Sequence, residues 1–526
     1  MSSVLSPSNV DSTAVNVVQA RLPKLSPKFI AQHYPASVKL LHVHLIHRHG
    51  ERTPSAYAFP NISPKYWNFC TESNRLNSDF AKVAQHHAPG VYKDVNKGRK
   101  WYSYVFKTNQ AAEHSNGNAQ FTAATCALGQ LTDVGRQSMT ALGAHMRALY
   151  VDALGFLPAV PRSGNGNGPT EDLYLRSTSY SRTRESLQQA LGGMYPNMPA
   201  SSPLFYINMR PAISENLYPD FQHKELEQLH IESAVKSIEL FGKEYAALHK
   251  RVAQTPGLGG EVEPEPKPAV PRASYFIWDT MSSMLAHGLA LPKDVDDEFV
   301  SQVSRMSAVE YMYPVKLSAK LARVQMEPFV GELVDTIANA VEADSGTLSR
   351  KPVPPKMSIY SGHDTTIGPL LSILGDALDG SPLLPKSTGP MWPPFASSLR
   401  IELLKDSTSP HPTVLSTRAD QSDKSTILPE ERTNLPNSAS SLYHQKPKGR
   451  ANSLSKPVNL RDYYVRIWYN DRSVQLPACL NPGTYHAKLG STVCTLDAFF
   501  EQIAHVVPGD NAISQDSRVS ASTLKN

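Results

Sequence analysis

The stretch Arg48-His49-Gly50-Glu51-Arg52-Thr53-Pro54 carries the residues best suited to chemistry in this chain. It directly follows the apolar run 38–46, so a predicted strand ends in a turn that holds a histidine between two arginines. A guanidinium group matches phosphate oxygens in a bidentate manner, and its charge disfavours protonation of a nearby imidazole. We therefore expect His49 to be neutral and nucleophilic, in a turn that holds a phosphate monoester and attacks its phosphorus.

Two further segments pair an apolar run with a polar turn and a helix. In the first, residues 173–175 lead into Arg176-Ser177-Thr178, and apolar residues at helical spacing follow from Thr183 to Met194. In the second, residues 357–360 lead into a turn with His363-Asp364, before a helix that contains Leu370, Leu371 and Leu374. Because ligands of open α/β sheets lie beyond the carboxyl ends of the strands, the three turns are predicted to converge on one anion.

The His363-Asp364 pair has two interpretations. Taken alone, it is an ordinary helix N-cap, with Asp364 or Thr365 as the capping residue. Taken with the two arginine-containing turns, His363 is a donor to the phosphate and Asp364 a proton donor to the leaving alkoxide.

These segments together resemble the histidine acid phosphatase family, the branch of the histidine phosphatase superfamily that includes acid phosphatases and phytases. The quoted residues fit its R-H-G-x-R-x-P, R-S-T-x-x-x-R-T and His-Asp motifs. The resemblance implies that His49 forms a phosphohistidine, that Asp364 is the acid, and that no metal or organic cofactor is required. It also implies a set of phosphate-binding residues: Arg48, Arg52, Arg176 and His363.

The second motif departs from the family at one position. Ser179 stands where the family usually has an acidic residue, a change that leaves Arg176 in place. Arg182 and Arg184 are interpreted as surface charges of the following helix. Other segments also resemble the family and extend the likeness over most of residues 38–505: 129–135, 278–292 (with Asp279-Thr280 and His287-Gly288), 394–402, 464–479 and 494–499.

The predicted fold class is α/β, a phosphoglycerate-mutase-like three-layer sandwich with a mainly helical cap. We expect a disordered or targeting segment over 1–37, a histidine phosphatase domain over 38–505 and a disordered tail over 506–526. Within the domain, a Ser/Pro/Thr-rich insertion at 406–457 is predicted to be disordered. The expected α/β core comprises about 38–54, 126–200, 355–405 and 458–505, and the expected cap comprises about 55–125 and 200–345.

Composition narrows the class of partner. With a net charge of +5 over 526 residues and no long basic run, the chain is not expected to bind nucleic acid. No apolar run is long enough to span a bilayer, and the first residues lack the pattern of a signal peptide, so we expect a cytoplasmic or mitochondrial protein. Four cysteines are too few for a disulfide framework. Reduced thiols are therefore expected, although Cys479 and Cys494 would be able to pair in an oxidising compartment.

Three other functions are compatible with single features of the sequence. A metal site built from His42, His44, His47 and His49 is disfavoured, because alternate strand residues point to opposite faces. A phosphomutase or diphosphatase of the same superfamily shares R-H-G, but Arg52, Pro54 and the His-Asp turn favour the acid phosphatase branch. A non-catalytic protein that binds a phosphorylated ligand would be expected to lack His49 or Asp364, and both are present.

The sequence therefore predicts a phosphate-monoester hydrolase that acts on a small phosphomonoester. A lysophosphatidate-like substrate is favoured, and an inositol phosphate, as in a phytase, is the alternative. Sugar phosphates, phosphoproteins and the oligomeric state are left open.

Overall fold

The computed structural model describes most of the region in which the motifs lie. The described residues are 25–56, 59–75, 124–163, 170–198, 205–219, 224–258, 273–348, 353–374, 392–408, 460–504 and 506–507. The expectations for residues 1–24, for the insertion from 409 to 457 and for the tail from 508 onward lie outside these ranges.

The centre of the molecule is one mixed sheet, ordered β3-β2-β4-β1-β5-β6-β9-β8, with β7 paired to β6. The strands are β1 (Val38–Arg48), β2 (Leu173–Ser177), β3 (Ile207–Asn208), β4 (Met357–Gly362), β5 (Ser398–Asp406), β6 (Tyr463–Tyr469), β7 (Arg472–Val474), β8 (Tyr485–His486) and β9 (Gly490–Thr495). β1, β4, β2 and β3 are mutually parallel, while β5 is antiparallel to β1 and β6. The carboxyl ends of β1, β4 and β2 therefore meet at one edge.

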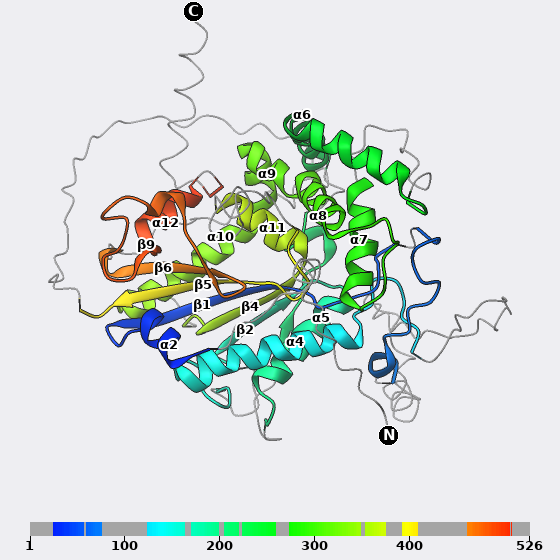
Figure 1. The fold of residues 1–526 in the computed structure, drawn as a ribbon. Coiled ribbons are helices and arrows are strands. Elements are labelled where there is room, and N and C mark those ends of the chain that lie inside the picture. The colour runs from blue at the N-terminus through cyan, green and yellow to red at the C-terminus, as the bar shows by residue number, and fades with distance from the viewer. Residues whose placement is uncertain are drawn as a thin grey trace, which may run out of the picture.

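Helices cover both faces of this sheet (Figure 1). The helices are α2 (Pro27–His33), α4 (Asp133–Met146), the π-helical turn Arg147–Ala153, α5 (Ser181–Met194), α6 (Lys224–Gln254), α7 (Ala273–Ala286), α8 (Asp297–Tyr311), α9 (Tyr313–Leu317), α10 (Ala319–Asp344), α11 (Asp364–Ile373) and α12 (Leu496–Ile503). Short 3-10 turns occur at Ala212–Ser214, Leu460–Asp462 and Pro477–Cys479.

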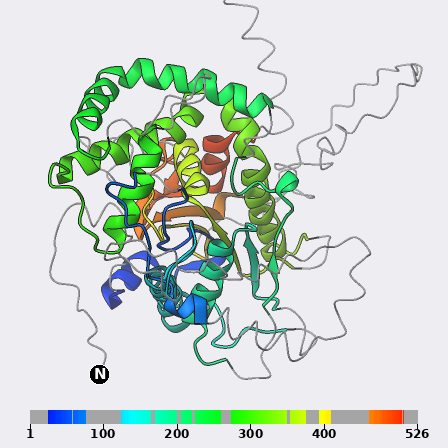
Figure 2. The same ribbon diagram turned by 90° about the vertical axis from the view of Figure 1, so that its right-hand side faces the viewer.

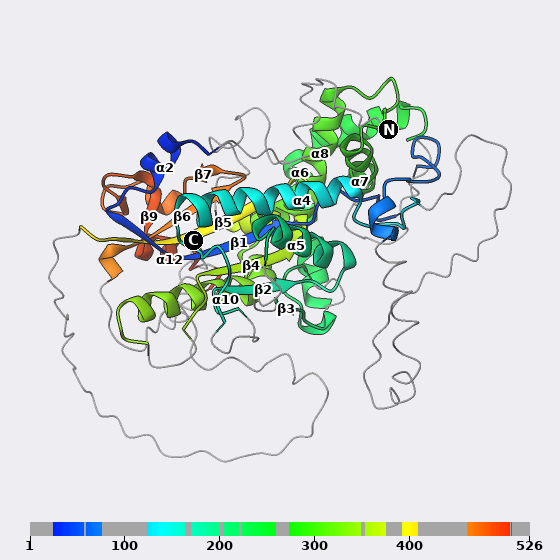
Figure 3. The same ribbon diagram turned by 90° about the horizontal axis from the view of Figure 1, so that it is seen from below.

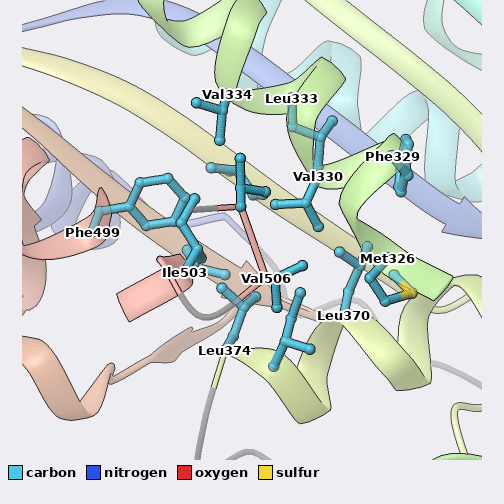
Figure 4. Packing of buried hydrophobic residues seen from close by; sticks show 14 of the residues in the cluster. Met326, Phe329, Val330, Leu333, Val334, Leu370, Leu374, Phe499, Ile503 and Val506 are labelled. Carbon is cyan, nitrogen blue, oxygen red and sulfur yellow. The ribbon is translucent and has the colours of Figure 1, made fainter. Parts of the chain in front are cut away.

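Alternation along β1 assigns the two faces. Val43 and Leu45 join the apolar cluster that contains residues of α4 and α5, whereas Ile46 joins the cluster on the other face. Figure 3, seen from below, shows α4 and α5 crossing the underside of the sheet. On the opposite face α10, α11 and α12 pack together through the side chains drawn in Figure 4, among them Phe329, Leu370 and Phe499. The predicted three-layer α/β class is confirmed.

A third apolar cluster holds the cap together. It joins α6, α7 and α8 to Phe59, Trp392 and Phe395. Figures 1 and 2 show these helices, drawn in green, gathered at the end of the sheet where β1, β4 and β2 finish.

Two expected boundaries differ in the structure. We expected α10 in the cap, but its apolar face packs on the sheet, and Leu333 O accepts a hydrogen bond from His44 Nε2 at 3.1 Å. For residues 1–37 we expected a disordered or targeting segment, but α2 lies within this range. It is capped by Ser26 and packs against the sheet through Phe29 and His33, whose rings lie 5.6 and 5.0 Å from that of Trp468.

All four cysteines are paired, contrary to the expectation of reduced thiols. Cys70 pairs with Cys126 at a Cα–Cα distance of 5.2 Å, and Cys479 pairs with Cys494 at 5.4 Å. The first pair forms because two segments run side by side. Cys70 N donates to Ala124 O at 2.9 Å and Cys126 N to Trp67 O at 2.7 Å, which brings the Cα atoms within disulfide range. Within the described ranges, no helix combines the length and the apolar character that a bilayer span needs.

Candidate active site

The three predicted turns meet at the carboxyl edge of the sheet. Arg48 pairs with Gly362 across β1 and β4, and Ser177 pairs with Ser361 across β2 and β4. Immediately beyond, His49 N donates to Gly362 O at 3.1 Å and Thr178 N donates to Ser361 O at 3.2 Å. Residues more than a hundred positions apart in the chain are thereby brought together.

His49 is arranged as a neutral nucleophile. Its Nδ1 lies 2.8 Å from Gly50 O, and since a carbonyl oxygen only accepts, Nδ1 must carry the proton. Nε2 is then left with its lone pair. The pKa of His49 lies well below its ordinary value, first because the ring is buried and then because Arg182, Arg48 and Arg52 are close. The imidazole therefore remains unprotonated and available to attack phosphorus.

His363 lies next to His49. The two rings are nearly perpendicular, with centroids 5.6 Å apart, and His363 Nε2 lies 3.0 Å from Thr178 Oγ1. The backbone N–H of His363 donates to Thr366 Oγ1 at 3.0 Å, which fixes the start of α11. Burial, followed by the charges of the nearby arginines, lowers the pKa of His363 as well. A neutral His363 is suited to donate a hydrogen bond to a phosphoryl oxygen.

Arg48 and Asp364 form a buried ion pair in this structure. Arg48 Nη2 lies 2.7 Å from Asp364 Oδ2, and Arg48 Nη1 donates to Pro393 O at 2.6 Å. The guanidinium carbon lies 4.1 Å from the centroid of the Phe395 ring. Trp392 Nε1 donates to the same Asp364 oxygen at 3.1 Å. The predicted acid and one predicted phosphate ligand are thus held side by side.

Arg52 is fixed from the cap. Its Nη2 donates to Asp279 Oδ1 of α7 at 2.6 Å, and its Nη1 donates to Thr53 O at 2.9 Å. Burial lowers the pKa of Arg52, but the surrounding groups, Asp279 foremost through its charge and its hydrogen bond, together outweigh that effect and the net shift is upward. Arg52 is a permanent cation at the edge of the site.

Arg176, predicted from the resemblance to hold the phosphate, lies elsewhere. Its Nη2 contacts Glu215 Oε1 and Asn216 Oδ1, each at 2.5 Å, and its Nη1 contacts Glu332 Oε2 at 2.8 Å. The side chain is fully buried among these partners. Arg176 lies within β2 rather than beyond its end, so its side chain points to the α10 face and not to His49.

Arg182, which we expected to be a surface charge, takes the place that was assigned to Arg176. It is the first charged group among the causes of the lowered pKa of His49, and also of His363. Its guanidinium carbon lies 4.3 Å from the centroid of Tyr180, and no carboxylate partner is found for it in the described part of the chain. Burial and the charge of Arg52 lower its pKa to about 10. A partly buried cation without an ion-pair partner is suited to bind an anion.

The Gly129–Gly135 element packs against the turn after β1 that carries His49, which we call the nucleophile turn. Gly135, in the first turn of α4, approaches the backbone of Gly50 and Glu51 so closely that a Cβ at either glycine would collide with backbone. Thr132 N donates to Glu51 O at 3.0 Å, and Thr132 Oγ1 caps α4. His287 Nε2 lies 2.8 Å from Thr132 Oγ1. The motif therefore has a structural role: its glycine allows the amino-terminal end of α4 to pack directly against the nucleophile turn.

His42, His44 and His47, weighed above as metal ligands with His49, bind backbone carbonyl groups instead. His42 Nδ1 lies 2.8 Å from Pro355 O, and His47 Nδ1 lies 3.1 Å from Arg48 O. No group of His, Cys, Asp or Glu in the described ranges has an arrangement that would hold a metal ion.

These buried histidines predict a loss of stability in mild acid. Burial lowers the pKa of His42 and of His47 to about 4, and that of His44 well below 6.5. Each then binds a proton in the unfolded chain near pH 6.5 but not in the folded one, so stability falls as the pH drops below 6.5. We expect a loss of roughly 2 kcal/mol per histidine between pH 6.5 and 5. Urea unfolding at these two values measures it, and His42→Phe should show a smaller fall than the wild type. An equal fall in both proteins would contradict the assignment.

Comparison with known proteins shows the family to which the chain belongs. The family model of the histidine phosphatase superfamily (branch 2) matches residues 39–424, and the chain belongs to this superfamily. A probable acid phosphatase of Schizosaccharomyces pombe is 27% identical over 481 residues, which are 90% of this chain and 93% of the relative. The lysophosphatidic acid phosphatase type 6 of Mus musculus is 26% identical, over 52% of this chain and 58% of the relative.

Solved phytase structures are also similar. The phytase of Citrobacter braakii has a TM-score of 0.48 at 14% identity and covers 89% of this chain and 98% of its own. A Hafnia alvei phytase in complex with myo-inositol hexakis sulphate has a TM-score of 0.49 at 13% identity, over 90% of this chain and 98% of its own. On the family match and the acid phosphatase relatives, the predicted family and the predicted activity, phosphate-monoester hydrolysis, are confirmed.

Proposed function

We propose that this phosphate-monoester hydrolase works through a phosphohistidine formed on His49 Nε2. The observation that carries the proposal is a neutral imidazole, with its lone pair on Nε2, in the field of Arg182, Arg48 and Arg52. Nε2 attacks phosphorus in line, the P–N bond forms, and the ester P–O bond breaks. The arginines and His363 hold the non-bridging oxygens and stabilise the charge of the transition state. Attack by water on the phosphohistidine then releases inorganic phosphate and restores His49.

Asp364 is proposed as the proton donor to the leaving alcohol. It begins α11 directly after His363, so its carboxyl group lies on the same turn as a phosphate ligand. The contact with Arg48 fixes the Asp364 carboxyl group next to one of the arginines that are proposed to bind the phosphate. In the second half of the reaction the same carboxylate takes a proton from the attacking water.

A comparison of leaving groups tests the role of Asp364. Nitrophenolate is a good leaving group and needs little protonation, whereas an alkoxide needs much. Asp364→Asn is therefore expected to slow the hydrolysis of alkyl phosphates about 10²–10⁴-fold and of nitrophenyl phosphate far less. The matched measurement is kcat on both substrates with one purified variant. If Asp364 were only a helix cap, both activities would fall equally and slightly while Tm decreased.

For the natural substrate we propose a phosphomonoester of the lysophosphatidate type. The support is the similarity to the lysophosphatidic acid phosphatases, which is a similarity in sequence, whereas the phytases are similar in fold only. A panel of lysophosphatidate, glycerol phosphate, a sugar phosphate and inositol hexakisphosphate, compared by kcat/KM, ranks the candidates. A preference of more than tenfold for the inositol phosphate would favour the phytase alternative.

The compartment, like the absence of nucleic-acid partners, stays a prediction. The two disulfides weigh against a reducing compartment and favour an oxidising one, which is the opposite of our expectation from the amino terminus. Counting free thiols in protein isolated under alkylating conditions decides between them.

A further inference from the structure

One face of α7 points from the cap into the phosphate site. Tyr275 and Asp279 are four residues apart and therefore share a face of the helix. Asp279 contacts Arg52 directly. Directly after the end of this helix, His287 Nε2 lies 2.8 Å from Thr132 Oγ1, next to the nucleophile turn. The chemistry proposed above uses none of these residues.

Both carboxylate oxygens of Asp279 are occupied by the nucleophile turn. Oδ1 accepts from Arg52 Nη2 at 2.6 Å, while Oδ2 accepts from the backbone N–H of Ser55 at 2.7 Å and from its hydroxyl at 2.8 Å. The side chains of Arg52 and Asp279 are only 3% and 4% exposed. Asp279 thus binds this segment at Arg52 and at Ser55, and the Arg52 guanidinium group is predicted to bind phosphate.

We propose that Asp279 is a positioning residue of the reaction: from the cap, it holds the Arg52 guanidinium in the orientation that receives the phosphoryl group. The inference rests on the proposed function of Arg52. It assigns to α7 a part in the chemistry, in addition to its packing within the cap.

Repulsion among the arginines is the physical reason for such a residue. Arg48, Arg52 and Arg182 all act on His49 in a buried site, where like charges are poorly screened. Arg48 is held by Asp364 and by Pro393 O. Among the described residues, the only side-chain hydrogen bond of Arg52 besides the one to Asp279 is to Thr53 O of its own turn. Without Asp279, the Arg52 side chain is free to turn away from the other two cations before a phosphate arrives.

Another buried pair in the molecule provides a matched control. Arg400 and Asp471 also form an ion pair, with side chains 1% and 2% exposed, on the part of the sheet formed by β5 and the turn after β6. Asp471→Asn and Asp279→Asn each remove one carboxylate charge from a buried arginine. Both variants are expected to lower Tm, but only Asp279→Asn should change catalysis.

The test is a double-mutant cycle of Asp279→Asn and Arg52→Ala, measured with nitrophenyl phosphate on the full-length protein. In the wild-type background, Asp279→Asn is expected to lower kcat/KM about 10- to 100-fold and to weaken inhibition by inorganic phosphate. In the Arg52→Ala background the same substitution should change kcat/KM less than about threefold, because its target is gone. If Asp279→Asn does not fold, Asp279→Glu, which keeps the charge but shifts it by one methylene, replaces it in the same cycle.

Two results would overturn the inference. One is an equal loss of kcat/KM in both backgrounds, which would show that Asp279 acts independently of Arg52. The other is unchanged kcat/KM together with a lowered Tm, as in Asp471→Asn, which would reduce the pair to a structural contact. A wild-type protein without phosphatase activity would instead reject the proposed function, so the two failures are distinguishable.

Discussion

Replacing His49 with alanine is expected to reduce kcat about 10⁴-fold or more while leaving the fold intact. The proposed reaction passes through a bond from His49 Nε2 to phosphorus, whereas the Nε2 of the neighbouring neutral imidazole, His363, contacts Thr178 Oγ1. The ring donates only to Gly50 O, so its removal leaves one carbonyl without a partner. The cost in unfolding free energy should therefore be about 1–3 kcal/mol. Steady-state kinetics and urea unfolding of one preparation give both numbers.

His287→Ala is the control for this experiment. His287 is a partly buried histidine with hydrogen bonds at both ring nitrogens, and it lies behind Thr132 rather than in the phosphate site. It should lower stability by a similar amount and retain most of the turnover. Residual activity of His49→Ala above about 1% of the wild type would mean that another group carries the phosphoryl transfer.

Arg182→Ala is expected to lower turnover with little loss of stability, whereas Arg176→Ala is expected to lower stability. Arg182 contributes a cation to the site, and its removal should cost about 3 kcal/mol of transition-state stabilisation, or roughly 10²-fold in kcat. It should cost little stability, because no ion pair is broken and the repulsion with Arg52 is relieved. Arg176→Ala instead leaves Glu215 buried without its partner, so unfolding free energy should fall by about 3–5 kcal/mol.

The comparison requires kcat and urea unfolding for both variants under the same conditions. Arg184→Ala, an exposed arginine of the same helix, is the neutral reference. The phosphate site as we describe it would be misplaced if Arg176→Ala lost its turnover at full stability while Arg182→Ala kept both.

The three turns and the strand–turn–helix order were predictable because they depend on local sequence. Apolar runs of strand length precede each motif, and parallel strands bring their ends together whatever the intervening chain contains. His49, His363 and Asp364 lie in such turns, and each is found at the sheet edge.

Arg182 was not predicted as a phosphate ligand, because the resemblance implies Arg176 in that role. Arg176 is the fourth residue of a five-residue strand, and its side chain must point to one face of the sheet. Arg182, in the first turn of α5, comes after the strand end, where ligands of such sheets lie. Because ligands lie beyond the carboxyl ends of the strands, the position of each arginine relative to the strand end distinguishes Arg182 from Arg176 in the sequence alone.

Contacts between distant segments were beyond the reach of the sequence. The grip of Asp279 on Arg52 joins residues 227 positions apart and depends on how the cap folds back over the sheet. The pairing of Cys70 with Cys126 depends on two irregular segments running side by side, for which no periodic pattern exists. The docking of α2 against Trp468 is of the same kind.

Trapping the covalent intermediate tests the central claim most directly. Wild-type protein is mixed with a phosphomonoester carrying labelled phosphate, and the reaction is stopped within milliseconds under alkaline conditions, which preserve phosphohistidine. We predict label on His49 in an amount approaching one per chain before steady-state turnover, and none on His49→Ala. Label on a serine or an aspartate, or a full single turnover without any labelled protein, would contradict the account.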